Sequence, residues 1–210
     1  MGASWPGGAT EFPERPIQWP TAGAPTTLNA VALPPLASAD FRCTDCALSY
    51  PDITPAMAAA IVRSLPAEYR AVFRNVPDAA VRRRPAPATW SMIEYACHVR
   101  DVFAVSVDRI QLALATDHCT FAPLGNDERA VRLGYDQASV DETLEDLAAS
   151  AERLADLLGT LSGGDWDRTA SRLPGEDRDV RWMARQAAHE GRHHLRDIEQ
   201  VHQDGPATPP

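Results

Sequence analysis

The sequence of 210 residues contains no lysine, because all 20 of its basic residues are arginine. Schiff-base catalysis needs a lysine amine, and the Walker phosphate-binding loop places a lysine on the phosphates. Both classes of enzyme are therefore excluded. The Arg- and Ala-rich composition is typical of a high-GC bacterial gene.

Long apolar runs are also missing. No stretch approaches the ~20 apolar residues that span a bilayer, and the chain does not open on the basic and apolar regions of a secretory signal. We therefore expect a cytoplasmic protein without a membrane partner. The net charge of −9 argues against a protein that neutralises nucleic-acid phosphates. The expected partner is a small-molecule substrate.

Cysteine is scarce, with Cys43, Cys46, Cys97 and Cys119 in the whole chain. A disulfide scaffold is not expected from so few. Cys43 and Cys46 form a CxxC pair, which can be half of a zinc site or a redox pair. A structural zinc site needs two further ligands and there is no second CxxC. The pair is therefore a candidate for a separate thiol site, with a site shared across a dimer, a small disulfide or two ordinary thiols as the alternatives.

Proline and glycine are concentrated near the N-terminus, and neither suits a helix or a central strand. We expect residues 1–40 to be a disordered Pro/Gly-rich tail. Residues 41–64 then hold the CxxC segment and a short helix, residues 65–203 a helical bundle, and residues 204–210 a C-terminal tail.

Helical periodicity begins after Thr54. Pro55 suits the first turn of a helix, whereas Pro66 predicts an interruption before a second helical run. Two capping boxes mark later helix starts: Ser91 with Glu94 three residues on, and a second box at residues 139–142.

Three longer helices are expected over about residues 91–115, 139–162 and 180–201. No alternating strand pattern and no internal repeat is evident. With the helical run before residue 85, these helices predict an all-α four-helix bundle.

The chain has six histidines, and His189 and His193 lie four residues apart in the run HEGRHH. On a helix this spacing puts both rings on one face, as a metal ion requires of two converging imidazoles. His98, on another expected helix, completes a three-nitrogen site if the bundle brings the helices together. The i,i+4 relation selects His193 rather than His194.

Several acidic residues accompany these histidines. Asp101 and Asp197 could accept a hydrogen bond from the far nitrogen of a ligating imidazole. Glu190 makes HEGRH a formal match to the zinc-protease motif HExxH, although Gly191 weakens the helix there. We rank a metallohydrolase of that type below the other functions and leave the role of Glu190 open.

Taken in order, these motifs resemble the DinB/YfiT-like superfamily over about residues 65–203. The resemblance is carried by Trp90-Ser-Met-Ile-Glu94 with His98 and Asp101, then Tyr135 and the helix after Ser139, then Asp165-Trp-Asp-Arg-Thr169, and finally the run from His189 to Ile198.

This resemblance implies an up-down-down-up four-helix bundle, often dimeric, with a metal triad at His98, His189 and His193. It also implies chemistry of the kind known for bacillithiol transferases and mycothiol-dependent maleylpyruvate isomerase. Other relatives have lost activity.

We therefore expect a metal-dependent S-transferase, isomerase or hydrolase that activates a low-molecular-weight thiol, such as mycothiol, or water. The ion is expected to be zinc or nickel, with iron and manganese as alternatives. The alternative function is a non-catalytic bundle that binds a metal or a small molecule.

Overall fold

The computed structural model describes residues 33–204. Most of the expected N-terminal tail and the C-terminal tail after Asp204 lie outside the described residues. The predicted all-α four-helix bundle is confirmed. Its long helices are α1 (Pro55–Phe73), α3 (Met92–Ala115), α5 (Val140–Thr160) and α6 (Val180–Gln203).

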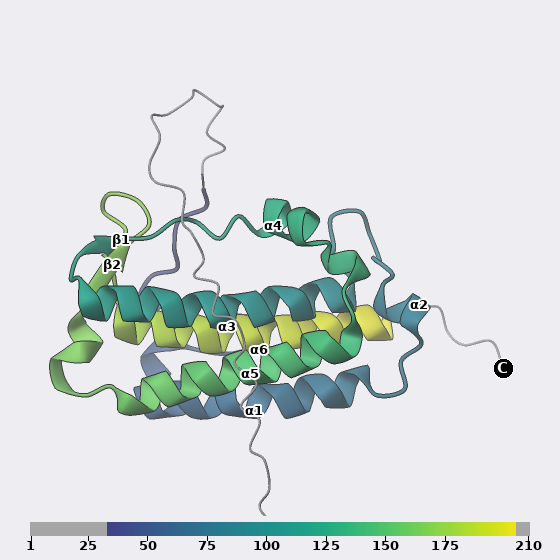
Figure 1. Ribbon diagram of the computed structural model, residues 1–210, viewed down its shortest axis with the longest axis horizontal. Helices are drawn as coiled ribbons and strands as arrows, with labels where there is room; N and C mark the ends of the chain where they lie inside the picture. Colours follow the sequence, from purple (N-terminus) through teal and green to yellow (C-terminus); the bar gives the residue numbers. More distant parts are fainter. Residues whose placement is uncertain (1–32, 205–210) are drawn as a thin grey trace, which may run out of the picture. The chain divides into compact units, whose positions relative to one another are not determined.

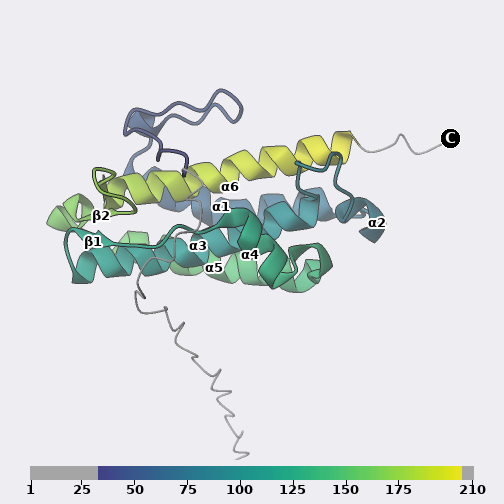
Figure 2. The same cartoon turned by 90° about the horizontal axis from the view of Figure 1, so that it is seen from above.

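The bundle has the up-down-down-up order, since α1 and α6 run in one direction and α3 and α5 in the other (Figure 1). Each of α1 and α3 packs against both α5 and α6. Because α3 and α5 are parallel neighbours, the chain between them must return along the bundle. That return, residues 116–139, carries α4 (Asn126–Leu133) and lies along the outside of α3 (Figures 1 and 2).

A small sheet accompanies the bundle, although the sequence shows no alternating strand pattern. Three short strands, β1 (Cys119–Thr120), β2 (Thr169–Ser171) and β3 (Arg178–Asp179), form a small sheet in the order β1-β2-β3. β1 and β2 pair in parallel, and β2 and β3 pair antiparallel. Strands of two or three residues are too short to show an alternating pattern.

The remaining elements are single turns that join the long ones. They are the 3-10 turns η1 (Tyr50–Asp52), η2 (Tyr135–Gln137) and η3 (Gly163–Asp167), and the short helix α2 (Asp78–Val81).

The predicted helix starts are confirmed. Ser91 and Glu94 form a complete capping box on α3, and Ser139 accepts a hydrogen bond from the Glu142 backbone at the start of α5. The expected interruption at Pro66 was wrong, because Pro66 lies inside one continuous helix, α1. Proline there removes one helical hydrogen bond, but burial of Pro66 and its neighbours in the core offsets that cost.

The CxxC segment and the residues just before it are attached to the bundle, including residues that were expected to belong to the tail. The Arg178 guanidinium donates to the carbonyls of Leu36 and Ala37, at 3.1 Å each, and the Trp182 indole donates to Ala37 at 3.1 Å. This segment therefore lies beside the first turns of α6 (Figure 2).

Within residues 33–204, no helix combines the length and apolar character that crossing a membrane requires.

Gly191 marks the closest approach of α6 to its neighbours. A Cβ atom at this position would lie 2.5 Å from Leu65 Cδ1 of α1 and 2.8 Å from Phe103 Cζ of α3. Both neighbours are fully buried. The Tyr69 hydroxyl, also buried, donates to the Gly191 carbonyl at 2.9 Å. The glycine that weakens HEGRHH as a helix is thus required by packing.

Asp101 joins α3 to the return segment. Its buried carboxylate accepts hydrogen bonds from Tyr135 at 2.6 Å and Arg129 at 2.5 Å, and from Arg100 at 2.8 Å. Burial by itself raises the pKa of Asp101. The Tyr135 hydrogen bond and the Arg100 charge lower that pKa by more, so it lies below its usual value.

We predict that Gly191→Ala destabilises the fold. Overpacking costs about 1–3 kcal/mol, which exceeds the ~0.5–1 kcal/mol that alanine gains over glycine in a helix. The control is Gly159→Ala on α5, where a Cβ meets nothing within 4 Å and a small stabilisation is expected. Thermal unfolding of both variants measures the difference, and equal melting temperatures for the two would contradict the packing argument.

We also predict that Asp101→Asn lowers stability by about 2 kcal/mol at neutral pH, because charge-assisted hydrogen bonds are lost. The folded-state pKa is depressed, so this contribution is complete above about pH 4, the unfolded value, and disappears as the pH falls further. Urea unfolding of wild type and variant should show a gap that narrows toward about pH 3. A gap independent of pH would disprove the electrostatic role.

Candidate functional site

The candidate metal-ligating side chains of α6 lie within two turns of that helix. His189 and His193 are four residues apart, and their ring centroids are separated by 5.3 Å, as i,i+4 spacing predicts. Glu190 and His194 each follow one of them, about 100° further round the helix. α6 therefore presents two adjacent faces, and each carries side chains that can bind a metal.

The first face meets a hairpin in the N-terminal segment. Tyr50 N–H donates to the Phe41 carbonyl and Cys43 N–H donates to the Leu48 carbonyl, each at 2.9 Å. Ala47 turns the chain between them with a left-handed backbone, at φ 59°. This hairpin holds Cys43 and Cys46 on the side that faces α6.

Aromatic rings pack the hairpin against α6. The His189 ring makes edge contacts with Phe41 at 5.2 Å and with Tyr50 at 5.8 Å between centroids. The Tyr50 hydroxyl donates a hydrogen bond to the Gln186 side chain. The position of His189 is therefore set by both α6 and the hairpin.

Four side chains gather at this contact: Cys43, Cys46, His189 and His193, which we call the Cys–His group. Their ligand atoms all lie within 4.8 Å of one another, and Cys43 Sγ is 3.4 Å from His193 Nδ1. Both cysteines are free thiols. Burial raises the pKa of Cys46 to about 11.

His189 is the unsatisfied member of the Cys–His group. Both of its ring nitrogens are buried, and neither has a hydrogen-bond partner among the described residues. Leaving a buried polar atom unpaired costs about 1–3 kcal/mol. Imidazole nitrogen is a common metal ligand, so an ion bound to the Cys–His group would remove part of this cost.

The second face meets α3. Glu190 Oε2 lies 3.3 Å from His98 Nε2 and 3.2 Å from His194 Nε2. These three residues, which we call the His–Glu group, also have all their ligand atoms within 4.8 Å of one another. His98 is buried, whereas the side chains of Glu190 and His194 are 21% and 17% exposed, so solvent reaches one side of the group.

The His–Glu group combines one negative charge, one positive charge and one neutral imidazole. Burial opposes ionisation of Glu190, but hydrogen bonds from His194 and His98 hold the pKa of Glu190 far below its usual value. Burial also lowers the pKa of His194, but hydrogen bonds to Asp197 and Glu190 outweigh it and raise that pKa to about 9. Burial lowers the pKa of His98. Without a metal, the group is an ion pair of His194 and Glu190 beside a neutral His98.

The residues predicted as one triad fall in different groups. His189 and His193 lie with the two cysteines, and His98 lies with Glu190 and His194. A single ion on His98, His189 and His193 therefore stays a prediction, which the arrangement of the described side chains does not itself assemble.

The two aspartates predicted to orient the ligating imidazoles, Asp197 and Asp101, lie in different surroundings. Asp197 accepts from His194 Nδ1 at 2.7 Å and lies 3.7 Å from His193 Nε2, so it lies behind both histidines. Asp101 is held by Arg100, Arg129 and Tyr135 as described above.

Sequence reasoning passed over His194 and the connection between the CxxC pair and α6. The i,i+4 relation selected His193 for a face shared with His189, but Glu190 and His194 are also four residues apart. A signal for the second omission was present, because CxxC followed by HxxxH has the ligand spacing of Cys2His2 zinc sites. The long separation between the two halves concealed it.

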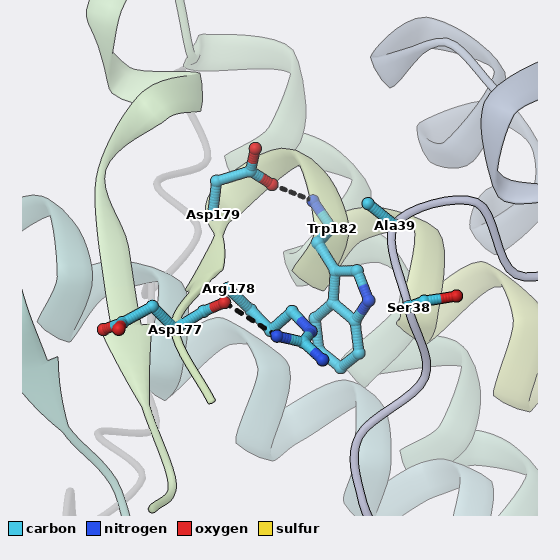
Figure 3. Close-up of a pocket in the computed structure, with 6 residues that line it drawn as sticks. All are labelled: Ser38, Ala39, Asp177, Arg178, Asp179 and Trp182. Carbon is cyan, nitrogen blue, oxygen red and sulfur yellow. Dashed lines mark hydrogen bonds between the residues drawn. The ribbon is translucent and has the colours of Figure 1, made fainter. Parts of the chain in front are cut away.

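A surface hollow of about 290 Å³ lies next to this region, lined by Ser38, Ala39, Asp177, Arg178, Asp179 and Trp182 (Figure 3). Arg178 lies over the Trp182 ring at 5.4 Å, and Asp179 caps α6 by accepting from Trp182 N–H at 2.6 Å. The Trp182 ring contacts Tyr50, which in turn contacts His189. Tyr50 thus lies between Trp182 of the hollow and His189 of the Cys–His group. None of the four residues of the Cys–His group lines the hollow.

Comparisons with known proteins agree with this fold. The chain is similar to YfiT from Bacillus subtilis, described as a probable metal-dependent hydrolase with an unusual four-helix bundle topology. The two share 15% identity and a TM-score of 0.67, over 72% of this chain and 89% of that one. No curated protein matches the sequence.

The sequence profile of the DinB superfamily matches residues 61–198. This range contains all four long helices in whole or in large part, together with the candidate ligands on α6, and excludes the CxxC pair. The chain belongs to the DinB superfamily.

Proposed function

We propose that this protein is a metal-dependent enzyme that activates water or a low-molecular-weight thiol at the His–Glu group. The proposal rests on the placement of the Glu190 carboxylate between His98 and His194, within 3.3 Å of each Nε2 atom. Two imidazoles and one carboxylate are the ligands of one class of catalytic zinc site, which keeps a further position for water or substrate.

The donor set of this chain fits such an ion. Burial favours neutral His98, and Glu190 is ionised at neutral pH. The Nε2 atoms of His98 and His194 both hydrogen-bond to Glu190, so an ion would bind here by displacing the protons on these nitrogens. An ion bound here would lower the pKa of a bound water or thiol and so provide a nucleophile near neutral pH.

Neighbouring residues orient this group. Asp197 accepts from His194 Nδ1 at 2.7 Å and so directs Nε2 of the same ring toward Glu190. The Tyr95 ring stacks on His194 with 5.2 Å between centroids, and Trp90 makes an edge contact with His98 at 5.2 Å. These rings restrict rotation of both imidazoles and exclude water from one side.

The choice of thiol over water is supported by the family resemblance alone. The thiolate of a co-substrate such as mycothiol would form a carbon–sulfur bond with an electrophilic carbon, either expelling a leaving group or, in an addition, leaving the thiol proton on the substrate. Water would instead hydrolyse an ester or amide and release the alcohol or amine. The similarity to YfiT favours hydrolysis only through the description of that protein.

A second candidate is a non-catalytic bundle. The observation that favours it is that His98, Glu190 and His194 already satisfy one another as a hydrogen-bonded ion pair without a metal.

We predict that Glu190→Gln and His98→Ala each abolish most turnover, whereas His202→Ala leaves it unchanged. His202 is the matched control, because it is an exposed histidine on the same helix. Asp197→Asn should lower kcat/KM by roughly 10–100-fold, as expected for a residue that orients a ligand.

The measurement uses full-length protein purified without a histidine tag and loaded with zinc or nickel. Hydrolysis of p-nitrophenyl acetate and conjugation of mycothiol to monochlorobimane are followed separately, and the faster reaction identifies the nucleophile. Metal binding by the His–Glu group without turnover in either assay would favour the non-catalytic bundle. Turnover that survives Glu190→Gln would rule out the His–Glu group as the catalytic centre.

A further inference from the structure

The Cys–His group carries an inference that does not depend on the catalytic proposal. We propose that Cys43, Cys46, His189 and His193 form a closed structural zinc site that fastens the N-terminal hairpin to α6. Zinc would be bound permanently at this site, and its four coordination positions would all be filled by protein side chains, which leaves none for a substrate.

The donor chemistry is the first support. Two thiolates and two imidazoles are a complete tetrahedral ligand set for zinc. Zn–S and Zn–N bonds of about 2.3 and 2.0–2.1 Å imply a sulfur-to-nitrogen separation of roughly 3.5 Å in a tetrahedron. Cys43 Sγ lies 3.4 Å from His193 Nδ1, and the ligand atoms of all four residues lie within 4.8 Å of one another. The ligands are therefore close to bonding positions as they stand.

The second support is the state of His189. Its nitrogens are buried without a hydrogen-bond partner in the described part of the chain, between the rings of Phe41 and Tyr50. A histidine that served only to fill the core would need a partner for its N–H. A zinc ion bound by Cys43, Cys46 and His193 would lie within reach of the same ring and would satisfy one of its two unpaired nitrogens.

The shape of the hairpin is the third support. Ala47 adopts a left-handed backbone directly after Cys46, and the Cys43 N–H bond to Leu48 closes the turn. This geometry turns both thiols toward α6. Phe41 and Tyr50 of the hairpin already pack against His189 of α6, and a zinc ion would add a crosslink between the same two segments.

The two groups on α6 also differ in how many ligands they would offer to an ion. Four protein ligands leave zinc no open position, whereas the three residues of the His–Glu group leave one. Asp197 lies behind both groups, next to His194 and His193. The HEGRHH run thus supplies a structural ion on one face and a solvent-accessible group on the next.

The test is the zinc content of reduced, untagged full-length protein, measured by elemental analysis for four variants. The double variant Cys43→Ser/Cys46→Ser and the single variant His189→Gln should each lose one equivalent of zinc and melt at a lower temperature. Cys119→Ser, which removes another buried thiol, should retain that zinc. Glu190→Gln should also retain it, which separates this proposal from the catalytic one.

Two measurements on wild-type protein keep the proposal testable if the double variant does not fold. Cobalt substitution should produce a sulfur-to-cobalt charge-transfer band and the intense visible bands of a tetrahedral ion. Alkylation followed by peptide mass spectrometry should find Cys43 and Cys46 protected until a chelator removes the ion. Unprotected thiols in zinc-loaded protein, a Cys43–Cys46 disulfide, or unchanged zinc content in the double variant would each overturn the site.

Discussion

The contact at Gly191 determines how near α6 can come to α1 and α3. Leu65 and Phe103 occupy the space that a Cβ would need, and Tyr69 bonds to the carbonyl of the same residue. Because this point fixes the rotation of α6 about its own axis, it also fixes the direction in which each neighbouring side chain on α6 points. The candidate metal ligands before and after Gly191 are therefore positioned by a rigid helix rather than by a loop.

Helix geometry explains why the side chains of HEGRHH fall into two groups. Residues four apart share a face, and residues one apart differ by about 100°. His189 and His193 therefore meet the hairpin of the N-terminal segment, and Glu190 and His194 meet His98 on α3. One short motif can be interpreted as a zinc-protease signature or as a ligand pair, but its two registers face different partners in the folded chain.

The N-terminal hairpin lies outside the range that the DinB profile matches, and the fold is shared with YfiT at 15% identity. The bundle is thus a framework that tolerates wide sequence change, because its core needs apolar residues at helical spacing more than particular side chains. Two of the four side chains in the Cys–His group, Cys43 and Cys46, come from the hairpin, outside the range that the profile matches.

The sequence by itself determined the long helices, their capping residues and the clustering of histidines on α6, because periodicity, capping and i,i+4 spacing act over a few residues. It did not determine that α1 continues through Pro66, because core burial outweighs a local preference there. Only the tertiary structure decided which group each histidine joins. Cys43 and His193 are separated by 150 residues, and such contacts depend on helix rotation and chain return, which local patterns do not encode.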